Sequence, residues 1–169
     1  MLEETRYRVL ILGIGNTGRQ DDGLGWRLLD FIKNNIEDCV IEYRYQLQVE
    51  DAELISKYET IIFVDATKEV TEEGYYFKDC LPKGSFTLTT HALHPESIVY
   101  LCETLYHKRP KVYILGIQGY EWELKTGLST QARINLNKAI VFVSTLLKTR
   151  ENTDNENLLP HMVRDKLDN

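Results

Sequence analysis

The sequence has few cysteines, few prolines and no long hydrophobic run, and these shortages exclude several classes of protein. Its three cysteines, Cys39, Cys80 and Cys102, are odd in number and far apart, so neither a disulfide framework nor a C-x-x-C metal site is predicted. No segment approaches the roughly 18 consecutive apolar residues of a membrane span. The N-terminus lacks the apolar core of a signal peptide. We therefore expect a cytoplasmic protein with reduced thiols and no membrane association.

Positive charge is also scarce. The chain has 20 lysines and arginines against 26 aspartates and glutamates, which gives a formal net charge of −6 at pH 7. Binding to nucleic acid is disfavoured, because phosphate contacts need clustered basic residues. A negative chain is compatible with a cation or with a basic protein surface as its partner. The 169 residues and the hydrophobic content of 43% fit one globular domain.

Strand and helix patterns alternate along the chain. Near-continuous apolar runs, typical of strands buried on both faces, occupy residues 7–13, 60–66 and 111–117. More polar strands are predicted at 39–47, 74–80 and 85–90, and helices at 24–34, 50–58, 95–105 and 130–148. This alternation predicts a three-layer α/β domain with a mostly parallel central sheet.

The last residues differ in composition from the rest of the chain. Residues 149–169 are polar, rich in Asn and Asp, and without an apolar stripe. We predict a single domain over 1–148, followed by a flexible tail over 149–169. A segment that binds a partner is the alternative interpretation of this tail.

Polar residues and glycines follow the predicted strands where those strands end. They are the loop 15–25, Asp65, His91 and Gln118. In open α/β sheets, ligands bind beyond the carboxyl ends of the strands. Each residue alone could be a turn former or a structural hydrogen-bonding group. Their predicted convergence at one edge of the sheet favours a functional site there.

The first loop contains two conflicting signals. Gly13, Gly15 and Gly18 have the G-x-G-x-x-G spacing of a dinucleotide-binding loop, which suggests a nucleotide-binding module. Asp21 and Asp22 follow closely and would place negative charge beside a bound phosphate. The predicted helix also starts too late for its N-terminus to hold that phosphate. One of the two aspartates can complement a helix dipole, which leaves the other available for a cation.

The order of the motifs resembles that of the nickel–iron hydrogenase maturation endopeptidases. The first motif is "ILGIGNTGRQDDGLGWRLL" (11–29), with the G-[IV]-G-N and D-[DE]-G segments of that family. The second is "FVDA" (63–66), in which an aspartate closes a buried strand. The third is "TTHALHP" (89–95). The last strand and loop are similar in "ILGIQ" (114–118) and "GLS" (127–129), which precede a long helix.

The resemblance covers about residues 7–148 and implies a function. Members of this family remove a C-terminal peptide from the hydrogenase large-subunit precursor after nickel insertion. The residues that match their metal-contacting side chains are Asp22, Asp65 and His91, which the resemblance identifies as the catalytic and metal-binding set. It implies nickel carried by the substrate. We expect that other divalent cations such as zinc or cadmium can substitute for the nickel, and that the protein acts as a monomer. The implied fold is an α/β/α sandwich with a mixed sheet of five strands.

The sequence departs from the family pattern at two positions and in a longer tail after Lys148, and one residue competes with a predicted ligand. Gly119 and Thr130 stand where proline is common. His94 is the nearest alternative to His91, but its position before Pro95 favours a role at the start of a helix. The departures leave the particular substrate open.

Elementary chemistry agrees with this hypothesis. Two carboxylates and one imidazole suit Ni²⁺, Zn²⁺ or Cd²⁺, and three protein ligands leave coordination positions open for substrate groups or water. The chain has no G-x-S-x-G or H-E-x-x-H motif. Cys102 lies on the apolar stripe of its helix, and Ser129 is positioned to cap one. A metal-dependent peptidase is the predicted function. A non-catalytic assembly protein with the same fold is the main alternative.

Overall fold

The computed structural model describes residues 9–37, 39–84 and 93–151, and within them the chain forms a five-stranded sheet. The strands are β1 (Val9–Ile14), β2 (Val40–Arg44), β3 (Thr60–Thr67), β4 (Tyr75–Asp79) and β5 (Lys111–Gln118). Their order in the sheet is β2-β1-β3-β5-β4. The pairs β1–β2, β1–β3 and β3–β5 are parallel, whereas the edge strand β4 runs antiparallel to β5. The mostly parallel, mixed sheet that we predicted is confirmed.

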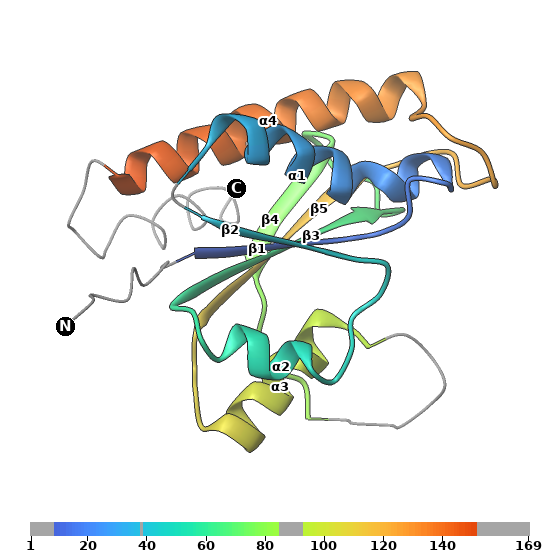
Figure 1. Ribbon diagram of the computed structural model, residues 1–169. Coiled ribbons are helices and arrows are strands. Elements are labelled where there is room, and N and C mark those ends of the chain that lie inside the picture. Colours follow the sequence, from blue (N-terminus) through green and yellow to red (C-terminus); the bar gives the residue numbers. More distant parts are fainter. Residues whose placement is uncertain (1–8, 38, 85–92, 152–169) are drawn as a thin grey trace.

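Helices cover both faces of this sheet. On one face lie α1 (Leu24–Asn35) and α4 (Thr130–Glu151), and on the other lie α2 (Asp51–Ile55) and α3 (Pro95–Tyr106), as Figure 1 shows. A short 3-10 helix, η1 (Gln20–Gly23), precedes α1. The fold is therefore a three-layer α/β/α sandwich, as predicted.

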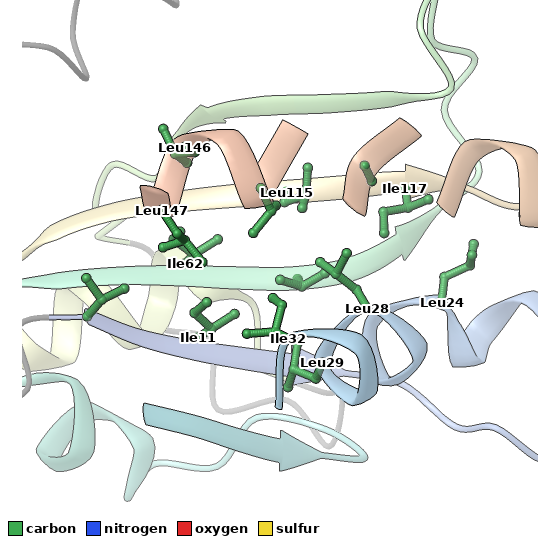
Figure 2. Packing of buried hydrophobic residues seen from close by; sticks show 14 of the residues in the cluster. Ile11, Leu24, Leu28, Leu29, Ile32, Ile62, Leu115, Ile117, Leu146 and Leu147 are labelled. Atoms are coloured by element: carbon green, nitrogen blue, oxygen red, sulfur yellow. The ribbon is translucent and has the colours of Figure 1, made fainter. Parts of the chain in front are cut away.

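The uninterrupted apolar strands are explained by two separate cores. Successive side chains of a strand point to opposite faces of the sheet. On β1, Ile11 therefore belongs to the core beneath α1 and α4, whereas Leu10 and Leu12 belong to the core against α2 and α3. Figure 2 shows the first core, where Leu28 and Leu29 of α1 lie over the sheet. A strand covered on both faces needs apolar residues at every position.

Several boundaries differ slightly from the predictions. Strand β3 ends at Thr67, one residue beyond the predicted run 60–66. Helix α4 ends at Glu151 rather than at Lys148, so it includes the start of the predicted tail. The predicted strand at 85–90 and the rest of the tail, 152–169, lie outside the described residues. The thiol of Cys102, on α3, is buried in the core between the sheet and helices α2 and α3, as predicted. Among the helices that the structure describes, none is long and apolar enough to cross a membrane.

Candidate functional site

Close backbone contacts bring the loop after β1 onto the ends of the central strands. Gly15 has a φ of +141°, and a Cβ atom there would collide with the carbonyl oxygen of Asp22. At Gly25, at the start of α1, a Cβ atom would lie 2.7 Å from the carbonyl oxygens of both Ile14 and Val64. Only glycine permits these approaches. The helix therefore begins directly against the carboxyl ends of β1 and β3.

This arrangement brings two of the predicted site residues, Asp22 and Asp65, near one another. Asp22 lies in η1 after β1, and Asp65 lies near the end of β3, the strand parallel to β1. The two carboxylates are close enough for the negative charge of Asp22 to raise the pKa of Asp65. Asp22 and Asp65 therefore lie at the same edge of the sheet, and their joint role with His91 in one site stays a prediction.

Asp65 has an environment that disfavours its charged form. Burial is the main cause, and the charge of Asp22 adds to it, while the N–H of Ala66 donates a hydrogen bond of 2.8 Å to Oδ1 and partly offsets both. The result is a pKa of about 7 for Asp65. Perturbation of this kind in a carboxylate pair is common at functional sites.

Asp22 is less strongly perturbed because two cations lie near it. Burial raises the pKa of the Asp22 carboxyl, and the positive charges of Arg19 and Lys68 oppose that rise. The Lys68 ammonium group lies 5.1 Å from the centroid of the Trp122 ring, and Arg19 donates a 3.4 Å hydrogen bond to the Trp122 carbonyl oxygen. Both cations are therefore associated with the loop between β5 and α4.

Asp21 is fully buried and has a different environment from its neighbour. Its carboxylate accepts hydrogen bonds from the N–H groups of Tyr120 (2.7 Å), Glu121 (2.9 Å) and Ser129 (2.7 Å), and from the Ser129 hydroxyl (2.7 Å). Burial alone would raise the pKa of Asp21, but these donors lower it below its ordinary value. We expected one of the two aspartates to have a structural role at a helix N-terminus. Asp21 has a structural role, but its partners belong to a loop about 100 residues away.

The other candidate residues have mixed outcomes. His91 lies outside the described residues, so its predicted role as a ligand stays a prediction. His94 directly precedes α3 and is exposed, as expected for a residue at the start of a helix. The Gln118 side chain does not serve as a free ligand, because its Oε1 accepts hydrogen bonds from the N–H and hydroxyl of Thr71. Ser129 caps α4, since its Oγ accepts the N–H of Ala132 at 3.2 Å.

The site that the structure describes can offer two carboxylates to a cation. Within residues 9–37, 39–84 and 93–151, no group of three or more His, Cys, Asp and Glu side chains is arranged to hold a metal ion. The arrangement is less suited to a dinucleotide. Helix α1 begins only at Leu24, and the N–H of Gly18 already donates to the Asn16 side chain at 2.8 Å.

Comparison with known proteins identifies the fold. No family model matches the chain, and no curated protein matches it. Among solved structures, it is similar to the nickel–iron hydrogenase maturation protease HycI from Thermococcus kodakarensis KOD1, with 20% identity over 84% of this chain and 93% of that chain, and a TM-score of 0.67. The hydrogenase maturating endopeptidase HybD from E. coli has 17% identity, coverage of 85% and 93%, and a TM-score of 0.68.

A third similar structure is the hydrogenase 2 maturation peptidase from Thaumarchaeota archaeon SCGC_AB-539-E09. It has 18% identity over 83% of this chain and 97% of that chain, with a TM-score of 0.60. The chain therefore has the fold of the hydrogenase maturation proteases, and the resemblance of its motifs is matched by a resemblance in three dimensions. At these identities the likeness establishes the fold.

Proposed function

We propose that this protein is a hydrogenase maturation endopeptidase, which removes the C-terminal peptide of a nickel–iron hydrogenase large-subunit precursor after nickel insertion. The observation that carries the proposal is the pair Asp22 and Asp65, two acidic side chains held close together at the carboxyl edge of the sheet. The solved structures named above, which are maturation proteases with the same fold, support it.

In this proposal the carboxylates recognise the nickel of the precursor. Two carboxylate oxygens are suitable ligands for a divalent cation, and the cation would compensate the repulsion between Asp22 and Asp65. His91 is the proposed third contact. Zn²⁺ or Cd²⁺ would suit the same donors. A carboxyl group binds a cation in its deprotonated form. Because the pKa of Asp65 is about 7, its carboxyl group is partly protonated near neutral pH and must release that proton on binding.

The chemistry of cleavage would depend on the same cation. Positive charge held at the sheet edge can polarise a peptide carbonyl or a water molecule. That property would supply chemistry that the buried thiols of the chain are poorly suited to provide. Cys80 and Cys102 are buried, and burial raises the pKa of their thiols to about 12 and about 11.

Cleavage of the precursor in its nickel-loaded and nickel-free forms tests the proposal. The purified protein should shorten the loaded precursor by a C-terminal peptide and leave the nickel-free form intact, as followed by gel electrophoresis and mass spectrometry. Stable binding of the loaded precursor without cleavage would instead support the non-catalytic assembly protein. Equal cleavage of both forms would contradict recognition of the metal.

A further inference from the structure

A second set of contacts ties the site loop to the β5–α4 loop (residues 119–129). Beside the four hydrogen bonds that the Asp21 carboxylate accepts, the N–H of Asp21 donates to the Glu121 carbonyl oxygen at 3.0 Å. Gly119 lies against Asp21 so closely that a Cβ atom on the glycine would be 2.7 Å from the Asp21 Cβ atom. Asp21 is thus enclosed by one loop along its backbone and its side chain.

Gln20 adds three contacts to the same loop. Its N–H donates to the Lys125 carbonyl oxygen (2.9 Å), its Nε2 donates to Glu121 Oε2 (2.6 Å), and its Oε1 accepts the N–H of Glu123 (2.9 Å). Gln20 has a backbone φ of +48°, a conformation that residues other than glycine rarely adopt. Such a conformation persists when surrounding contacts hold it. We call these two residues the Gln20–Asp21 anchor.

The next residue along the chain is Asp22, and its own fixed contacts are local. Its N–H donates to the Arg19 carbonyl oxygen and its carbonyl oxygen accepts the N–H of Asn16, both at 3.2 Å. The contacts that reach beyond the site loop are instead made by the two residues that precede Asp22 in the chain. The Gln20–Asp21 anchor joins the site loop to the β5–α4 loop and thereby restricts the position of Asp22.

We propose that Asp21 is a positioning residue, which holds Asp22 beside Asp65 before a cation binds. The inference rests on the proposed function for the meaning of the Asp22–Asp65 pair. It assigns the adjacent aspartates different tasks. Asp21 does not contact the cation and acts only by holding the backbone of η1. Asp22 contacts the cation.

The Gly119 position is consistent with this assignment. The resemblance pattern has proline there, but in this chain the N–H of Gly119 donates to the Thr67 carbonyl oxygen at 2.9 Å. Proline has no N–H to make that bond. The β5–α4 loop is thus fastened both to the end of β3, which carries Asp65, and to Asp21.

The test compares Asp21→Asn with Asp51→Asn in the full-length protein. Asp51 is a matched control, because it is a buried carboxylate that also accepts a backbone N–H, from Gln48, and its other side-chain partner is Arg44 of β2. The Asp21→Asn change keeps the shape of the side chain but places an NH₂ group where the carboxylate accepts hydrogen bonds from the β5–α4 loop. Hydrogen exchange of the Asn16 and Asp22 amides reports whether η1 is held, and calorimetric titration with Ni²⁺ alone reports whether the carboxylates are positioned for a cation.

Asp21→Asn should accelerate exchange of the Asn16 and Asp22 amides by about tenfold or more, as expected for weakened hydrogen bonds to a charged group. It should weaken Ni²⁺ binding by a similar factor. Asp51→Asn should leave both within about twofold, even at an equal loss in Tm. Unchanged exchange and affinity in Asp21→Asn, or equal changes in the two variants, would overturn the proposal.

A milder variant covers the case in which Asp21→Asn does not fold. Ser129→Ala removes one donor to Asp21 and should give a smaller change in the same direction. Unchanged exchange in this variant, at a measurable loss in Tm, would also count against the proposal. The exchange measurement needs no metal, so it decides the role of Asp21 even if the wild-type protein binds no nickel and cleaves no precursor. A wild-type protein that binds no nickel and cleaves no precursor would contradict the proposed function but not the positioning role of Asp21.

Discussion

Asp51 and Asp65 both lie near the carboxyl ends of parallel strands, but the charges around them differ. Asp51 is buried and accepts a 2.9 Å hydrogen bond from Nε of Arg44, whose side chain also contacts Glu42. Asp65 has the negative charge of Asp22 near it, and among the described residues no ion pair involves either carboxylate of that pair. Asp51 has its charge compensated by a direct ion pair. Asp22 and Asp65 have none among the described residues, and we call them uncompensated in this sense, although the more distant charges of Arg19 and Lys68 act on Asp22.

The comparison distinguishes buried carboxylates that stabilise the fold from carboxylates that are available to bind a cation. An uncompensated carboxylate pair costs free energy in the folded state, because burial and repulsion both disfavour the ionised form. Asp51 avoids that cost through Arg44, and Asp21 avoids it through four hydrogen-bond donors. Asp65 retains it, and Asp22 retains the part that the charges of Arg19 and Lys68 do not offset. A bound cation would remove the cost, which is why we assign this pair to recognition of the metal.

The largest expected effect comes from neutralising the uncompensated pair. Asp22→Asn and Asp65→Asn should each lower the rate of cleavage of the nickel-loaded precursor by about 100-fold or more, since a lost charge contact in a partly desolvated site costs a few kcal/mol. His94→Ala should reduce the rate far less, because His94 is exposed at the start of α3. Cleavage time courses on the four proteins measure this. A fully active Asp65→Asn protein would contradict the role of the pair.

A second effect should be visible in the stability of the protein without any substrate. The pKa of Asp65 rises from its ordinary value of 3.8 to about 7 on folding. Between these values the folded state holds a proton that the unfolded state releases, so Asp65 makes stability fall as pH rises through this window. Above about pH 7 the loss is complete.

Asp65→Asn removes this loss and still offers an oxygen to the Ala66 N–H. Relative to the wild type it should gain roughly 1 to 4 kcal/mol between pH 4 and pH 8, the upper figure being the pKa difference converted to free energy. Urea unfolding of both proteins at several pH values measures the difference. A difference that stays constant with pH would show that Asp65 is not perturbed in this way.

The compensated region should behave in the opposite manner. Asp51→Ala leaves the Arg44 charge without one partner and the Gln48 N–H without its acceptor, and should destabilise the fold by about 1 to 3 kcal/mol. Cleavage should be unaffected once the protein is folded. The exposed pair Glu53–Lys57 is the control, because Glu53→Ala should change stability by less than about 1 kcal/mol. Comparable losses from Asp51→Ala and Glu53→Ala would contradict the comparison.

The smallest effect is expected from the end of the chain. Residues 152–169 have no apolar stripe in the sequence, so a protein ending at residue 151 should keep its stability within about 1 kcal/mol of the full chain. Thermal unfolding of the two proteins tests this. A larger loss would show that the tail docks on the domain.

Much of the fold could be predicted because its signals are local. Strands buried on both faces are apolar along their buried run, as in β1 and in residues 61–64 of β3, and Asp65 is the first charged residue after that run in β3. The role of Asp21 could not be predicted in the same way. Its partners, Tyr120, Glu121 and Ser129, lie 99 to 108 positions away, and three of the four donated hydrogen bonds come from backbone N–H groups that leave no signal in the sequence.

The departures at element ends also have a physical origin. β3 extends to Thr67 because all eight of its residues pair with β5, although the apolar pattern stops before Asp65. Main-chain pairing does not depend on the side chain, so the apolar pattern underestimates the strand. Helix α4 likewise continues to Glu151 through polar residues that keep its backbone hydrogen bonds without an apolar stripe.

The most direct test of the central claim is capture of the precursor by the immobilised protein, with and without nickel in the precursor. The wild type should retain the nickel-loaded form much more strongly than the nickel-free form, and Asp65→Asn should retain both forms equally and weakly. Asp51→Asn should behave like the wild type. If Asp65→Asn still distinguished the two forms as the wild type does, the uncompensated pair would not be the group that recognises the metal.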